Sequence, residues 1–82
     1  MSPKLPRVTS RQAIRALQNA GFAVFDQTGG HVYLHRWQND KWTERVTIPQ
    51  HPRKILKLKT LSSILHQANI SVDEFINLLH GK

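Results

Sequence analysis

Two adjacent glycines, Gly29 and Gly30, separate two runs of β-forming residues, and this pair constrains the fold more than any other feature of the chain. Glycine adopts positive φ without steric cost, so a glycine pair in this position predicts a tight β-hairpin. After the turn, polar and apolar side chains alternate over residues 31–35, as in a strand with one buried face. His31 therefore begins a strand directly after a turn, where a bulky ligand can approach its imidazole.

A helix is expected before this hairpin and a third strand after it. Thr9 and Gln12 have the spacing of a capping box, which predicts a helix from residue 10 that ends before Gly21. Three strands are expected, over residues 22–27, 31–37 and 42–48, and hairpins join them into an antiparallel meander. In the first strand, apolar residues occupy both even- and odd-numbered positions, so the sequence does not show which face of this strand is buried. Glu44 interrupts the apolar parity of the third, which is therefore expected to be bulged or exposed in its first half.

Two helices are expected to complete the chain. Thr60 and Ser71 are the predicted N-caps. The predicted buried faces are the apolar stripes of Leu61, Ile64, Leu65 and Ala68 in the first helix and of Phe75, Ile76 and Leu79 in the second. The order predicts an α+β fold in which helices pack on one face of a three-stranded antiparallel sheet. We expect a single domain over residues 9–80, preceded by a flexible N-terminal lead-in over residues 1–8.

The charge of the chain predicts a polyanionic partner. Lys and Arg number 12 against 5 Asp and Glu, which gives a net charge of +7. No acidic residue lies between Glu44 and Asp73, whereas that interval is rich in basic residues. Nucleic acid is the commonest partner for a protein with such a positive charge, and an acidic protein would be attracted to it equally. The residues that we predict to bind phosphate groups are Arg45, Lys54, Lys57 and Lys59.

The same composition disfavours several other classes of protein. The chain has no cysteine, no secretory signal at its N-terminus and no apolar run near the roughly 20 residues that span a bilayer. We therefore expect a cytoplasmic protein with no membrane partner. His31 and His35 lie about 13 Å apart on a strand and cannot share one metal ion, and no carboxylate cluster is present to hold magnesium. No metal and no other cofactor is expected.

His31 is the candidate catalytic residue. Imidazole can accept or donate a proton near neutral pH, which suits proton transfer, and the alternative is that His31 is an ordinary surface residue of the strand. Tyr33 shares the face of His31 and either stacks on a base or fills the sheet surface. Trp37 and Trp42 flank the second hairpin and are expected to pack across it.

Short motifs in a fixed order connect the chain to a known family. They are Gly21-Phe22, Gly29-Gly30-His31, Val46-Thr47-Ile48-Pro49-Gln50-His51, Thr60-Leu61-Ser62-Ser63-Ile64-Leu65 and Ile70-Ser71-Val72-Asp73-Glu74-Phe75. In this order they closely resemble the HicA toxins of bacterial toxin–antitoxin systems, over roughly Thr9 to Leu79. The resemblance implies a double-stranded-RNA-binding-domain-like fold and an mRNA interferase activity. It assigns catalysis to His31, and Gly30 stands where the family usually has serine.

The resemblance also implies a HicB-type antitoxin that covers the active site, with the toxin monomeric when free and hetero-oligomeric when bound. Together with the charge, it predicts a metal-independent endoribonuclease that cleaves mRNA. One alternative is a non-catalytic double-stranded-RNA-binding module, which would share the fold and charge but would not need His31. A DNA-binding helix-turn-helix over residues 61–79 is disfavoured, because Asp73 and Glu74 would repel phosphates.

Overall fold

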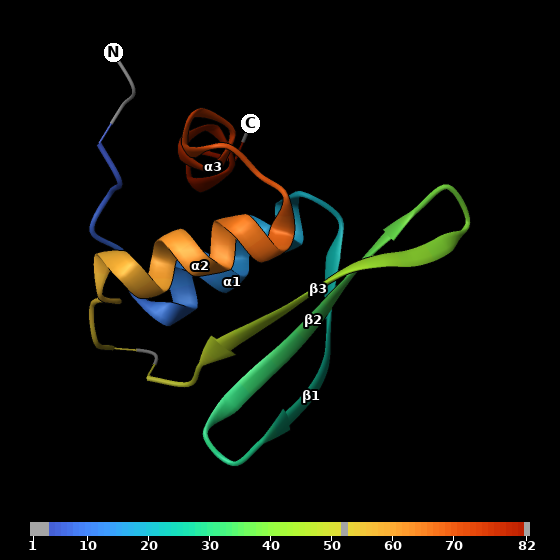
Figure 1. Ribbon diagram of the computed structural model, residues 1–82, viewed down its shortest axis with the longest axis horizontal. Coiled ribbons are helices and arrows are strands. Elements are labelled where there is room, and N and C mark those ends of the chain that lie inside the picture. Colours follow the sequence, from blue (N-terminus) through green and yellow to red (C-terminus); the bar gives the residue numbers. More distant parts are fainter. Residues whose placement is uncertain (1–3, 52, 82) are drawn as a thin grey trace.

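The chain folds as a helix, three strands and two helices in the computed structural model, which describes residues 4–51 and 53–81. The elements are α1 (Ser10–Asn19), β1 (Phe22–Thr28), β2 (His31–Gln38), β3 (Lys41–Pro49), α2 (Leu58–Ala68) and α3 (Val72–Leu79). The strands form one antiparallel sheet in the order β1-β2-β3 (Figure 1). The predicted α+β fold is confirmed. None of the helices described is long and apolar enough to cross a membrane.

Both hairpins turn through residues with positive φ. Gly29 and Gly30 connect β1 to β2 with φ of 60° and 79°, as the glycine pair predicted. Asn39 and Asp40 connect β2 to β3 with φ of 55° and 63°. Positive φ at both central residues is the geometry whose twist matches antiparallel strands, and Asn and Asp tolerate it better than most non-glycine residues.

Each outer strand contains a β-bulge. In β1 the pairing register shifts between Val24 and Asp26, which leaves Phe25 as an extra residue. Before the bulge, Phe22 is buried and Val24 half-buried, whereas Phe25 is exposed, so the even-numbered positions of this part of β1 face the core. In β3 the register shifts opposite Arg36, beside Glu44, so the predicted irregularity in this strand is confirmed as a bulge.

Glu44 is held at this bulge by polar contacts. The Thr43 hydroxyl donates to Glu44 Oε1 at 2.7 Å, and Arg36 Nε lies 3.8 Å from the same oxygen. The Thr43 hydrogen bond, a backbone hydrogen bond and the Arg36 charge together hold the pKa of Glu44 below its ordinary value. The carboxylate of Glu44 is therefore engaged locally.

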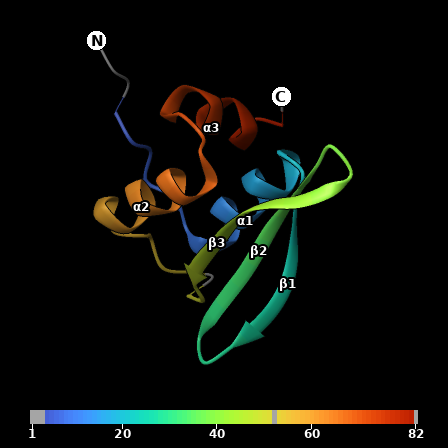
Figure 2. The ribbon, with the colours of Figure 1, turned by 45° about the vertical axis from the view of Figure 1, so that its right-hand side comes forward.

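The core lies between the sheet and two of the helices. Helices α1 and α2 cover one face of the sheet, and α3 packs against α1 on the side away from the strands (Figure 1, Figure 2). Phe75 of α3 is fully buried in this core, and Asn19 Nδ2 of α1 donates to the Leu78 carbonyl at 2.9 Å. The strands contribute the buried residues Val32, Leu34, Val46 and Ile48, and α1 and α2 contribute Ala13, Leu17, Leu61, Ile64 and Leu65.

The N-caps predicted from the sequence are present at two of the three helices. The capping box of Thr9 and Gln12 is present, and the Ser71 hydroxyl accepts from the Glu74 N–H at 3.1 Å. The prediction that Thr60 caps α2 is wrong: the helix begins at Leu58, and its N-cap Lys57 makes no side-chain cap.

The reason for the early start of α2 is a contact with the N-terminal segment. The Leu56 N–H donates to the Val8 carbonyl at 2.8 Å, and both side chains are buried. This contact orients the chain so that the helix begins directly afterwards. Val8 thus belongs to the packed part of the domain, while residues 1–3 of the predicted flexible lead-in lie outside the described residues.

Candidate functional site

His31 lies on the open face of the sheet, opposite the helices, at the first position of β2. It pairs with Pro49 of β3, and the Gln50 N–H donates to the Gly30 carbonyl at 2.7 Å next to it. The buried Ser10 hydroxyl at the start of α1 donates to the Pro49 carbonyl at 2.6 Å. Helix, sheet and turn together therefore fix the backbone that carries His31.

The imidazole of His31 is exposed, and one hydrogen bond orients it. Its Nδ1 lies 3.2 Å from the Gly29 carbonyl oxygen. A carbonyl can only accept, so in the neutral ring the proton resides on Nδ1. The other ring nitrogen, Nε2, is left with its lone pair free to accept a proton.

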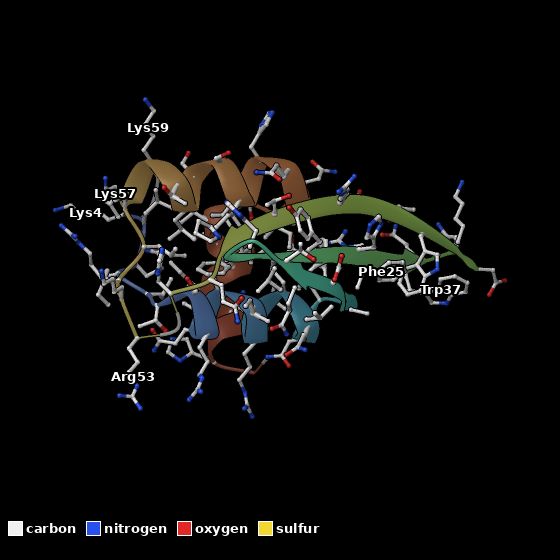
Figure 3. All side chains as sticks on the ribbon, turned by 90° about the horizontal axis from the view of Figure 1, so that it is seen from below. Lys4, Phe25, Trp37, Arg53, Lys57 and Lys59 are labelled. Atoms are coloured by element: carbon white, nitrogen blue, oxygen red, sulfur yellow. The ribbon has the colours of Figure 1, made fainter. Side chains whose placement is uncertain are left out.

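An open depression of about 410 Å³ lies between His31 and helix α2. The helix is fixed against the edge of β3, because Gln67 Oε1 accepts from the Thr47 N–H at 3.1 Å. Gln67 also donates through Nε2 to the Ser63 hydroxyl at 3.2 Å. The side chains around the depression are His31, Thr47, Lys59, Thr60, Ser63 and Gln67. The residues around the depression thus carry an imidazole, hydroxyls and an amide, and Lys59 borders it with a side chain that extends outward from α2 (Figure 3).

Lys54 and Lys57 do not line this depression but lie next to it. Both border a neighbouring hollow of about 340 Å³, which shares Pro49 and Thr60 with the first. Lys57 and Lys59 project from the same end of the molecule (Figure 3). Two of the predicted phosphate-binding lysines are therefore neighbours of the His31 depression, and Lys59 is part of it.

Arg45 and Tyr33 extend the open face away from the depression. The Arg45 guanidinium carbon lies 5.4 Å from the centre of the Tyr33 ring, a cation–π contact. The Tyr33 ring is 6.5 Å from the His31 ring, centre to centre. Tyr33 therefore follows His31 along the open face of the sheet, and Arg45, which pairs with His35, lies beside it.

The basic side chains of this surface carry uncompensated charge. Within residues 4–51 and 53–81, the one ion pair closer than 4.0 Å joins Arg36 to Glu44. Arg45, Lys54, Lys57 and Lys59 are all exposed. Unpaired exposed cations attract polyanions strongly, and this attraction weakens as salt is added.

Sequence reasoning missed the polar side of α2. Thr60, Ser63 and Gln67 are spaced three and four residues apart, which places them on one helix face. That spacing is visible in the sequence, but it does not show that the face turns toward His31. The missed contact of Ser10 with Pro49 has no signal in the sequence at all, because it joins residues far apart in the chain.

A serine at position 30 is expected to strain the turn. Gly30 has φ of +79°, and a Cβ added there meets no atom within 4 Å, so the cost is conformational rather than steric. We expect both Gly30→Ser and Gly30→Ala to lower the free energy of unfolding by about 1 kcal/mol, measured in urea.

Comparing these two variants isolates the effect of a hydroxyl at position 30. RNA cleavage is the activity that the sequence resemblance implies, and if a hydroxyl at this position contributes to it, Gly30→Ser will cut RNA faster than Gly30→Ala. Equal rates for the two variants would show that the hydroxyl has no role here.

The fold and the site define a small basic α+β protein with an exposed histidine beside a lysine-bearing helix. The family model for the HicA toxin of bacterial toxin–antitoxin systems matches residues 10–70, from the start of α1 to the end of α2. The chain therefore belongs to the HicA toxin family, and such a toxin has an antitoxin as its partner. Searches of curated proteins and of solved structures found no significant match.

Proposed function

We propose that this toxin is an endoribonuclease that cleaves mRNA without a metal ion, with His31 as the proton-transfer group. The observation that carries the proposal is the hydrogen bond of His31 Nδ1 to the Gly29 carbonyl. It leaves Nε2 available as a base at the edge of a depression that also contains Lys59. A base beside a cation is the minimum that this reaction requires.

The reaction uses the RNA's own nucleophile. His31 Nε2 removes the proton of a ribose 2′-OH, the 2′-oxygen bonds to the adjacent phosphorus, and the bond from phosphorus to the 5′-oxygen breaks. The 5′-oxygen takes up a proton from water as it leaves. Lys59 stabilises the negative charge that develops on the phosphoryl oxygens. The products are a 2′,3′-cyclic phosphate and a free 5′-hydroxyl.

The proposed antitoxin is of the HicB type, and it inhibits by covering the His31 depression. Free toxin is proposed to be monomeric and to form a hetero-oligomer with the antitoxin. The unpaired basic surface supports this arrangement, because an acidic partner would neutralise the same cations that bind RNA.

The test of the proposed function is the cleavage of a labelled single-stranded RNA by the purified protein in excess chelator. We expect fragments that end in a 2′,3′-cyclic phosphate. Fragments with a 3′-hydroxyl, or cleavage that the chelator abolishes, would contradict the metal-independent mechanism. Tight binding of duplex RNA with no cleavage would instead support the non-catalytic binding module.

Removing the Lys59 charge is expected to weaken RNA binding in a salt-dependent way. One phosphate contact contributes about 0.7 to the slope of log affinity against log salt for a single strand. We therefore expect Lys59→Gln to reduce that slope by about 0.7. Binding is measured by fluorescence anisotropy at several salt concentrations.

The matched control for this variant is Arg15→Gln. Arg15 is also exposed, but it lies on α1 and does not line the His31 depression. Its removal lowers the net charge equally and should leave the slope nearly unchanged. Equal effects of both substitutions would mean that Lys59 contributes only to the overall positive electrostatic potential of the protein.

A further inference from the structure

Four aromatic rings form a cluster on the open face of the sheet, and the proposed chemistry does not use it. Trp42 is at the centre of this aromatic cluster, with its ring 4.6 Å from Phe25, 4.8 Å from Trp37 and 6.4 Å from His35, centre to centre. Phe25 also lies 4.4 Å from His35. The expected packing of Trp37 across the hairpin on Trp42 is confirmed. The bulge in β1 adds Phe25 to the cluster.

The aromatic cluster is exposed to solvent. The exposed fractions of Phe25, Trp37 and Trp42 are 52%, 50% and 45%. These rings gather on the part of the sheet that extends beyond the helices, at the opposite end of the molecule from Lys57 and Lys59 (Figure 3). A contiguous exposed patch of large apolar side chains marks a binding surface far more often than scattered single residues do.

The cluster is continuous with the candidate site. Residues 31, 33, 35 and 37 alternate with buried positions of β2, so His31, Tyr33, His35 and Trp37 share one face. Trp37 lies about 20 Å along the strand from His31 at the usual rise per residue. Between them lies the Tyr33 ring, with Arg45 over it. One extended ligand can therefore reach both ends of the strand.

We propose that the aromatic cluster is a stacking subsite for unpaired RNA bases. The inference rests on the proposed function, and it names the substrate as RNA that is single-stranded over this face. Every base has a π-face that an aromatic side chain can cover, but in a duplex those faces are already stacked on one another. Bases laid along β2 would position the phosphate backbone near His31 and the lysines.

The charges around the cluster favour RNA over a protein as its occupant. Arg45 supplies a cation beside it, and Glu44 is engaged by Thr43 and Arg36. The Asp26 carboxylate lies on the same face, where it accepts from the Gln27 N–H at 2.8 Å. The chain as a whole carries +7, and its other exposed large apolar side chains among the described residues, Ile55 and Leu58, lie outside this face. Rings combined with unpaired cations are the features of a single-strand binding groove.

Tryptophan fluorescence tests the proposal directly, because the sequence has 2 tryptophans and both belong to the cluster. The His31→Ala protein, which is expected to bind RNA without cutting it, is titrated with three probes. These are a single-stranded RNA oligonucleotide, a duplex of the same sequence, and inorganic polyphosphate. We expect saturable quenching with the single strand and little with the other two. Equal quenching by the duplex or by polyphosphate would overturn the proposal.

A substitution in the cluster tests the same point by affinity. In the His31→Ala background, Phe25→Ala is expected to weaken single-strand binding about tenfold, the usual cost of losing one stacked base. The matched control is Leu58→Ala, which removes another exposed apolar side chain, with 40% exposure, from the far end of the molecule. Circular dichroism confirms that each variant is folded. An unchanged affinity in folded Phe25→Ala would overturn the proposal and would favour a protein as the partner that binds the aromatic cluster.

The two proposals can fail separately. If the unsubstituted protein cuts no RNA but single-stranded RNA still quenches the tryptophan fluorescence, the ribonuclease proposal is refuted and the stacking subsite is retained. Cleavage by Phe25→Ala with an unchanged KM would refute the subsite and keep the ribonuclease.

Discussion

Replacing His31 with alanine is expected to lower the rate of RNA cleavage by about 10²- to 10⁴-fold, the usual contribution of a general acid or base. The side chain is exposed, and the hydrogen bond that it makes goes to the Gly29 carbonyl within its own turn. Its loss should therefore leave folding intact. RNA affinity should also persist, because the lysines and Arg45 remain. Cleavage is measured on a labelled single strand in the presence of chelator.

The control for this variant is His66→Ala. His66 is an exposed histidine on α2 and does not line the His31 depression. Its substitution should leave cleavage unchanged, which excludes a general effect of losing a histidine. If His31→Ala cuts RNA at the rate of the unsubstituted protein, His31 is not the proton-transfer group.

Replacing Phe75 with alanine is expected to lower the free energy of unfolding by about 3–5 kcal/mol, because it leaves a cavity in a close-packed core. Phe75 is fully buried in α3. A domain of this length has a stability of only about 4–12 kcal/mol at the usual value per residue. A large fraction of that stability is thus expected to disappear, which urea titration followed by circular dichroism would measure.

The same substitution at an exposed site is the control. Phe25 is 52% exposed, so Phe25→Ala should cost about 1 kcal/mol or less. The comparison also tests whether α3, which begins beyond the residues that match the family, is integral to the domain. If Phe75→Ala is as mild as Phe25→Ala, α3 does not contribute to the core as the structure indicates.

The local features of the fold were predictable because short-range chemistry produces them. Positive φ at Gly29 and Gly30, the capping box of Thr9 and Gln12, and the alternation along β2 each depend on residues a few positions apart. Such signals are present in any chain with this sequence, whatever surrounds it. They were sufficient to place His31 at the start of a strand on an exposed face.

Features that depend on long-range contacts were not predictable. The start of α2 at Leu58 follows from the contact of Leu56 with Val8, which overrides the capping preference of Thr60. The bulge at Phe25 follows from the pairing of β1 with β2. In both cases the local sequence allowed more than one outcome, and packing selected one.

The sequence by itself determined the elements, the net charge of +7 and the exposed position of His31 after the glycine turn, because these depend on composition and local spacing. Only the tertiary structure decided what surrounds His31. Helix α2 is fixed against β3 through Gln67, so that Lys59 and Ser63, about thirty positions further along the chain, line the same depression as His31. The same sheet gathers Phe25 and the two tryptophans at its far end. Both arrangements require strands and helices to pack, and no short stretch of sequence encodes that packing.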